Sequence, residues 1–212
     1  MFRTSMRLMA ALSLALASLG AHAGAYDDFF RALQTDNASG VAALLQRGFD
    51  PNSRDPQGQT ALYAALRDGS GQVLALLMAH PQTQIDLANV AGETPLMIAA
   101  LKGRLDAARQ LLDRGATLER DGWTPLHYAA SGPEATLVKL LLDRGARPDA
   151  RSPNGSTPLM MAARNGTEAA VALLLARGAD PALRNEQNLV AADFARQAGR
   201  EKLALSLSQP AR

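Results

Sequence analysis

The stretch Gly122-Trp123-Thr124-Pro125-Leu126-His127-Tyr128-Ala129-Ala130 decides the fold, because its central Thr-Pro-Leu phrase occurs three times. The copies begin at Thr94, Thr124 and Thr157, so the steps between them are 30 and 33 residues. Each copy is followed by an Ala-Ala pair, and a glycine closes a leucine-rich stretch 21 residues after each threonine. These glycines are Gly115, Gly145 and Gly178. A period of about 33 residues indicates a solenoid of stacked repeats, not a globular core around one catalytic cleft.

Each copy predicts a pair of short helices. The threonine suits the N-cap, where its hydroxyl accepts a backbone N–H, and the proline suits the first helical position. A second helix carries leucines at core spacing, as in Leu140-Leu141-Leu142, and ends at Arg-Gly, where a cation and a left-handed glycine are favoured. Turn-forming residues such as Pro153-Asn154-Gly155 follow, and we expect them to project as a finger.

The pattern resembles the ankyrin repeat, which reads Gly-x-Thr-Pro-Leu-His-x-Ala-Ala, then Leu-Leu, then Gly-Ala-Asp. Residues 122–130 match every fixed position of its first part. Toward both ends the match decays, as expected of terminal repeats that face water: Thr60-Ala61-Leu62 lacks the proline, and Asn188-Leu189-Val190 lacks Thr-Pro. The resemblance implies an all-α ankyrin-repeat solenoid of about six helix-turn-helix units with projecting β-hairpin-like fingers, from near Tyr26 to about Leu207.

One finger, around Leu118 to Gly122, is shorter than the others. Gly115 to Thr124 spans 9 residues, whereas Gly145 to Thr157 spans 12. We therefore expect a notch in the row of finger tips, with local deviation from the regular stack.

The first 23 residues predict a cleaved signal peptide. Arg3 and Arg7 precede an apolar run of 12 residues, which is followed by Ala21-His22-Ala23, a small-x-small cleavage signature. That run is too short to cross a bilayer, which needs roughly 20 residues. A cut after Ala25 is the alternative. We expect a removed leader, 1–23, and a single ankyrin-repeat domain, 24–212, located in the bacterial periplasm or, alternatively, secreted.

Charge and composition narrow the class of partner. The whole chain has 22 basic and 20 acidic residues, but two arginines lie in the leader, so the mature chain is close to neutral. Near neutrality argues against nucleic-acid binding, which needs a concentrated positive field. The chain has no cysteine, which excludes disulfides and a lipoprotein anchor, and no membrane insertion is expected.

Candidate catalytic chemistry is sparse. Outside the leader the histidines are His80 and His127, and a zinc site usually needs three or four ligands. We expect no catalytic residue, no metal and no cofactor. The ankyrin resemblance implies that His127 hydrogen-bonds Thr124 and the neighbouring loop, a structural role. The residues to which we assign structural roles are Thr94, Thr124, His127, Thr157, Gly115, Gly145 and Gly178.

Two features predict a surface that binds a partner protein. Trp123, the only tryptophan, precedes Thr124 at the base of the short finger; it either contacts a partner or packs on the adjacent finger. Basic residues recur at one finger position and at the end of the first helix of each repeat. They are Arg54, Arg120, Arg151 and Arg184 in the fingers, and Arg67, Lys102 and Arg164 at the helix ends. In the ankyrin fold these finger and helix-end positions face the same groove. A groove lined by basic residues favours an acidic partner surface, although the ankyrin pattern itself tolerates basic residues there.

The sequence therefore predicts a non-enzymatic protein–protein interaction module, a scaffold or accessory to a periplasmic or envelope protein. The alternatives are an immunity-type inhibitor that occludes a toxin enzyme, and a secreted effector that acts on a foreign cell. Partner identity and oligomeric state stay open at this level.

Overall fold

A computed structural model describes residues 24–209, and the chain divides into two compact units, Met1–Thr83 and Gln84–Arg212. The signal-peptide prediction falls on residues outside the described range. Within residues 24–209 the secondary structure is helical apart from one isolated bridge, Arg54 to Thr60. The helices form six successive hairpins, which confirms the all-α solenoid of about six repeats.

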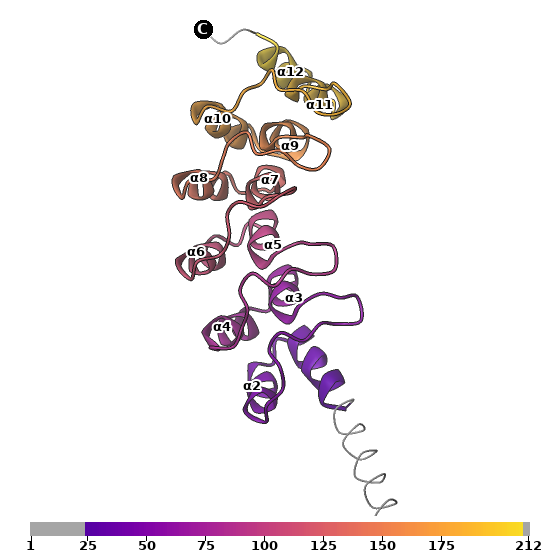
Figure 1. Ribbon diagram of the computed structural model, residues 1–212, viewed down its shortest axis with the longest axis vertical. Coiled ribbons are helices and arrows are strands. Elements are labelled where there is room, and N and C mark those ends of the chain that lie inside the picture. Colours follow the sequence, from indigo (N-terminus) through magenta and orange to yellow (C-terminus); the bar gives the residue numbers. More distant parts are fainter. Residues whose placement is uncertain (1–23, 210–212) are drawn as a thin grey trace, which may run out of the picture. The chain divides into compact units, whose positions relative to one another are not determined.

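The N-terminal unit contains the first two hairpins (Figure 1). Its elements are a helix over residues 24–34, α2 Ala38–Gln46, α3 Ala61–Asp68 and α4 Gly71–Ala79. Phe29 is fully buried and stacks on Phe49 with ring centroids 4.5 Å apart. Aromatic packing therefore closes the first repeat, where the ankyrin phrase is absent.

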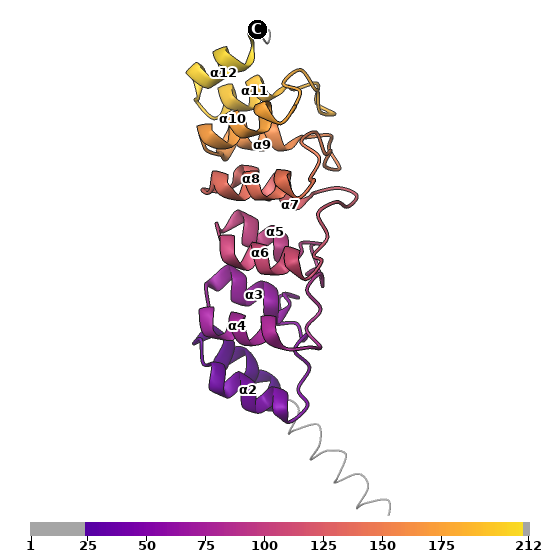
Figure 2. The ribbon, with the colours of Figure 1, turned by 90° about the vertical axis from the view of Figure 1, so that its left-hand side faces the viewer.

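The C-terminal unit contains the other four hairpins. Its helices are α5 Pro95–Leu101, α6 Leu105–Asp113, α7 Pro125–Ser131, α8 Ala135–Asp143, α9 Pro158–Asn165, α10 Glu168–Ala176, α11 Ala191–Gln197 and α12 Glu201–Leu207. The inner helices α5, α7, α9 and α11 pack on one another in order, and α6, α8 and α10 form a second row beside them (Figure 1). The segments before α7, α9 and α11 project beyond the ends of the inner helices as fingers (Figure 2).

The Thr-Pro-Leu phrases start the inner helices by the expected capping chemistry. Thr94 Oγ1 accepts the Met97 N–H and Thr157 Oγ1 accepts the Met160 N–H, each at 3.4 Å. The prolines occupy the first helical position of α5, α7 and α9. The backbone N–H of each threonine donates in return to the methionine sulfur, at 3.4 Å in both repeats. Methionine therefore supplies the return contact in repeats that lack the histidine of the ankyrin phrase.

Small residues let the inner helices approach closely. The Ala-Ala pairs of α5, α7 and α9 are fully buried. Gly166, which ends α9, lies so near α7 that a Cβ atom there would overlap the carbonyl oxygen of Ala130. The glycines that close the second helices have φ of +87° at Gly115, +96° at Gly145 and +86° at Gly178, a left-handed conformation that a side chain would strain.

Polar contacts join successive repeats of the C-terminal unit at the base of the fingers. Carboxylates of one repeat accept backbone N–H groups of the next. These contacts are Thr117 N to Asp86 Oδ2 at 3.0 Å, Arg147 N to Glu119 Oε1 at 2.8 Å and Asp180 N to Asp149 Oδ1 at 3.0 Å. The recurring contact keeps the fingers at the repeat spacing.

The second row of helices is joined by ion pairs. Arg144 Nη2 lies 2.9 Å from Asp113 Oδ1, and Arg177 Nη2 lies 2.6 Å from Asp143 Oδ1. Both arginines belong to Arg-Gly pairs, for which the sequence predicts only a favourable interaction with the helix dipole. Each one in fact reaches back to the preceding repeat.

Candidate functional site

Trp123 lines a small hollow on the inner helices of the C-terminal unit. The hollow has a volume of about 180 Å³ and is lined by Leu101, Trp123, His127, Tyr128 and Ser131; we call it the Trp123 pocket. The indole is half-buried, and it packs edge-on against His127 with ring centroids 5.2 Å apart. The ring thus packs on its own repeat and still leaves a face at the surface.

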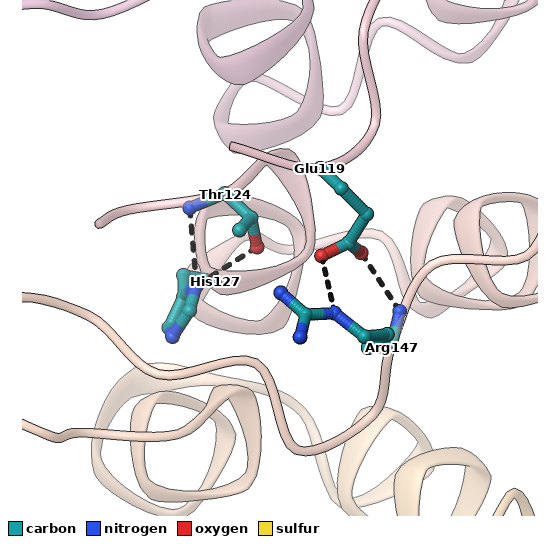
Figure 3. A network of polar contacts seen from close by, with 4 residues as sticks. All are labelled: Glu119, Thr124, His127 and Arg147. Atoms are coloured by element: carbon teal, nitrogen blue, oxygen red, sulfur yellow. Dashed lines mark hydrogen bonds and ion pairs between the residues drawn. The ribbon is translucent and has the colours of Figure 1, made fainter. Parts of the chain in front are cut away.

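His127 forms the floor of this pocket and is held by hydrogen bonds (Figure 3). Its Nδ1 accepts the Thr124 N–H at 3.2 Å and lies 2.9 Å from the Thr124 hydroxyl. Its Nε2 lies 3.0 Å from the Ser156 carbonyl oxygen of the next finger, so the neutral ring carries its proton on Nε2. Burial lowers the pKa of His127, against the opposing effect of the Ser156 hydrogen bond. The neutral imidazole therefore links its own repeat to the next one by hydrogen bonds.

Tyr128 forms one wall of the pocket and is fixed by the preceding finger. Its hydroxyl donates to Glu93 Oε1 at 2.9 Å, and Glu93 Oε2 accepts from Asn89 Nδ2 at 2.8 Å. Burial, together with the Glu93 carboxylate, raises the pKa of Tyr128. The phenol stays protonated at neutral pH, and its O–H proton is donated to Glu93.

The finger arginines hold backbone carbonyls. Arg151 Nη1 donates to the Gly155 oxygen at 3.2 Å, and Arg184 Nη1 donates to the Asn188 oxygen at 2.8 Å. In the N-terminal unit Arg54 Nη1 makes the same contact, four residues along the chain, with the Gly58 oxygen at 3.0 Å. The recurring arginine therefore closes the finger in which it lies, and Arg151 Nη1 also donates to the Arg184 oxygen of the next finger at 2.8 Å.

Arg120, in the short finger, makes a different contact. Its Nη1 donates at 2.8 Å to the Gly92 oxygen of the preceding finger, where the arginine position is occupied by Ala88. In the fingers of Arg54, Arg151 and Arg184, the arginine and the carbonyl that it binds are four residues apart. This spacing is visible in the sequence and could have predicted the contact, but an interpretation based on charge alone missed it. These contacts give the arginines a structural role, and partner binding by them stays a prediction.

The basic residues at the inner-helix ends differ from one another. Arg67 pairs with its neighbour Asp68, with Nε 2.7 Å from Oδ1. Lys102 and Arg164 are exposed, and within residues 24–209 neither side chain makes a hydrogen bond or ion pair. Both belong to the C-terminal unit, so the structure places two uncompensated cations on the same unit as the Trp123 pocket.

Metal and membrane sites are not apparent in the part of the chain that the structure describes. No group of three or more His, Asp or Glu side chains among residues 24–209 could hold a metal ion. No helix in that range is long and apolar enough to span a bilayer.

Comparison with known proteins gives the family. A family model described as ankyrin repeats, three copies, matches residues 29–120 and 115–185. Ankyrin repeat and SAM domain-containing protein 6 of Mus musculus is 34% identical over 109 residues, which are 50% of this chain and 12% of that protein. An ankyrin repeat-containing protein of Treponema pallidum (strain Nichols) is 30% identical over 125 residues, which are 58% of this chain and 42% of that protein. The chain thus spans less than half the length of these curated relatives.

A solved structure resembles the chain over a larger share. It belongs to the complex of a predatory endopeptidase from Bdellovibrio bacteriovorus with an immunity protein. The match has a TM-score of 0.72 and 27% sequence identity, and it covers 85% of this chain and 96% of that chain. Ankyrin repeats are protein–protein interaction modules. The repeats, their capping chemistry and these matches together show that the chain belongs to the ankyrin repeat family.

Proposed function

We propose that this protein is a non-enzymatic binding protein of the bacterial periplasm that docks on another protein as a scaffold or accessory. The observation that carries the proposal is the Trp123 pocket, which presents the only tryptophan of the chain on a rigid stack of inner helices. Tryptophan is enriched where partner proteins bind tightly. A rigid stack is already ordered before binding, so little conformational entropy is lost on association.

The proposal includes no catalytic chemistry, and this is supported by the hydrogen bonds of the polar side chains that line the Trp123 pocket. Among residues 24–209 the one buried histidine, His127, is neutral and bonded at both ring nitrogens, and Tyr128 is bonded to Glu93. Neither group is free to exchange protons with a substrate. The surface can therefore recognise a partner by its shape and its charge.

A crosslinked pull-down from periplasm tests the proposal. The bait is the wild-type protein, compared with Trp123→Ala. We expect the substitution to reduce capture of a discrete partner by roughly tenfold or more, the cost of a hot-spot residue, while helicity and melting temperature stay unchanged. Equal capture by the two proteins would remove Trp123 from the binding surface, and the absence of any discrete captured protein would refute the proposal.

Inhibition of an enzyme is a second candidate. It is favoured by the structural match to the endopeptidase complex that contains an immunity protein, because that match spans nearly all of the neighbouring chain. The test is the activity of the captured partner. Under this candidate, wild-type protein abolishes the partner's turnover and Trp123→Ala restores it; under the scaffold function, turnover is unchanged or increased.

The cellular location is part of the proposal and rests on the N-terminal sequence. Fractionation distinguishes the alternatives, since recovery from the periplasm supports the scaffold. Recovery from the culture medium alone supports a secreted effector that acts on a foreign cell.

A further inference from the structure

We propose that Asn154, in the finger before α9, is a site of spontaneous covalent modification, at which its side-chain amide is converted to an aspartyl or isoaspartyl carboxylate. Asn154 is exposed, and it is followed by Gly155, which has no side chain to hinder attack by its own backbone nitrogen. The modification is independent of the proposed function, because water is its only co-reactant. Hydrogen bonds distinguish this Asn-Gly pair from the second one in the chain, Asn165-Gly166.

The modification proceeds through a cyclic imide. The Gly155 nitrogen loses its proton to water and attacks Cγ of Asn154. The bond from Cγ to Nδ2 breaks, and the amide nitrogen takes a proton from water and leaves as ammonia. Water then opens the ring at either carbonyl, which gives aspartate or isoaspartate and restores the backbone N–H.

The amide that is attacked is activated by hydrogen bonds to its oxygen. Ser152 Oγ donates to Asn154 Oδ1 at 2.6 Å, and the Ser156 N–H donates to the same oxygen at 3.2 Å. When the Gly155 nitrogen attacks Cγ, negative charge develops on this oxygen, and donors that are already in place stabilise it. The two donors therefore form an oxyanion hole for the attack.

The attacking nitrogen is stabilised by contacts to its own finger and from the next one. Deprotonation of the Gly155 nitrogen spreads negative charge onto the Asn154 carbonyl oxygen, because both atoms belong to one conjugated peptide group. This oxygen accepts the Glu186 N–H at 3.0 Å. Arg151 adds a positive charge nearby, since its Nη1 lies 3.2 Å from the Gly155 oxygen. Both contacts favour the deprotonated nitrogen.

The pair Asn165-Gly166 is an internal reference. Its glycine N–H donates to the Ala162 oxygen at 2.9 Å, and the Gly155 N–H donates to the Ser152 oxygen at 2.8 Å, so each nitrogen must give up one hydrogen bond before it attacks. Among residues 24–209, however, no hydrogen bond reaches the side chain or the carbonyl oxygen of this second asparagine. The first pair therefore has activating contacts at both reacting groups that the second pair lacks.

The modification changes a contact that joins successive repeats. Asn154 Oδ1 holds the Ser156 N–H, and the Ser156 oxygen lies 3.0 Å from His127 Nε2. Isoaspartate lengthens the main chain by one carbon, so the acceptor moves away from Ser156. The finger also gains a negative charge. The aged finger is thus connected through Ser156 to the ring that packs against Trp123.

Mass spectrometry of the folded full-length protein, aged in mildly alkaline buffer, tests the proposal. Trypsin separates the two Asn-Gly pairs because it cuts after Arg151, Arg164 and Arg177, and the peptides 152–164 and 165–177 each contain a single amide side chain. We expect amide-to-carboxylate conversion in 152–164 to be roughly tenfold or more faster than in 165–177, the effect of at least two hydrogen bonds. In protein unfolded in guanidinium chloride the two rates should agree within about threefold, because these hydrogen bonds are absent.

Serine variants separate activation of the amide from rigidity of the finger. Ser152→Ala removes the hydroxyl that donates to Asn154 and should slow the conversion by roughly fivefold, the factor for one hydrogen bond. If Ser152 served only to hold the turn rigid, the looser finger of this variant would convert faster. Ser156→Ala is the matched control and should convert at the wild-type rate, because within residues 24–209 its buried Oγ makes no hydrogen bond and its N–H is kept.

The outcomes decide the proposal in either direction. Equal rates for the two peptides in the folded protein overturn it, and so does unchanged or faster conversion in a folded Ser152→Ala variant. Circular dichroism and melting establish that each variant is folded. If Ser152→Ala does not fold, the comparison of 152–164 with 165–177 in the wild-type protein still decides.

Discussion

Replacing Arg200 with alanine should loosen the last helical hairpin. Arg200 precedes α12, and its Nη1 lies 2.9 Å from the Ala162 oxygen, 3.0 Å from the Ala163 oxygen and 2.9 Å from the Gly166 oxygen. These carbonyls lie at the C-terminal end of α9, where the Ala162 oxygen also accepts the Gly166 N–H and the last carbonyls lack intrahelical donors. One guanidinium nitrogen therefore caps α9 from the next repeat.

The magnitude follows from the number of hydrogens available. Nη1 carries two N–H groups, so three contacts amount to about two full hydrogen bonds, each worth roughly 1.5–3 kcal/mol when the donor is charged. Arg200 is half-buried, so water can replace part of the loss, which points to the lower end of that range. We expect Arg200→Ala to lower the free energy of unfolding by about 3 kcal/mol.

Urea unfolding and amide hydrogen exchange measure the effect. In a solenoid, a lesion at a terminal repeat acts first on that repeat, so exchange should accelerate over α11 and α12 before it does so over α7. Lys202→Ala, a neighbouring exposed substitution, should change stability by no more than about 0.5 kcal/mol. A loss below about 0.5 kcal/mol in Arg200→Ala, or uniform acceleration of exchange, would refute the capping argument.

Three further predictions concern other contacts. Gly166→Ala should destabilise by about 1–3 kcal/mol, because its Cβ would overlap the Ala130 oxygen, whereas Gly71→Ala, with open space around it, should be neutral or stabilising in the same melt. The folded-state pKa of His127 is lowered, so the free energy that its neutral ring contributes to stability is fully present above about pH 6.5. That contribution declines as the pH falls and the unfolded chain takes up a proton. Urea titrations from about pH 7 to 5 should show this decline, and His127→Gln should flatten it. Arg120→Ala should accelerate amide exchange in the finger around Gly92, and unchanged exchange there would contradict the cross-finger contact.

Much of the candidate site lies within reach of sequence reasoning. The period of Thr-Pro-Leu, the missing three residues before Thr124 and the single tryptophan together locate the part of the chain where the Trp123 pocket lies. The hydrogen bond between His127 and Thr124, which the resemblance to the ankyrin repeat implies, is local, since the two residues are three apart.

Charge pattern alone did not separate the basic residues by role. Arg54, Arg151 and Arg184 form one aligned set in the sequence, and in the structure each donates to a finger carbonyl four residues ahead. Lys102 and Arg164 look like members of a similar row, yet among the described residues they alone of that helix-end set lack a pairing partner. A formal charge is visible in a sequence, but what neutralises it depends on side-chain direction and on neighbours from other repeats.

The sequence by itself determined the repeat, its capping residues and its glycines, because each of these depends on backbone geometry within a few residues. Only the tertiary structure decided which groups remain available at the surface. The hydrogen-bond donors of Ser131, Tyr128 and His127 are used in contacts that run within a helix, to the preceding finger and to the next finger. Hydrogen bonds between residues some 30 positions apart follow from how the repeats stack, and stacking is a property of packed side chains.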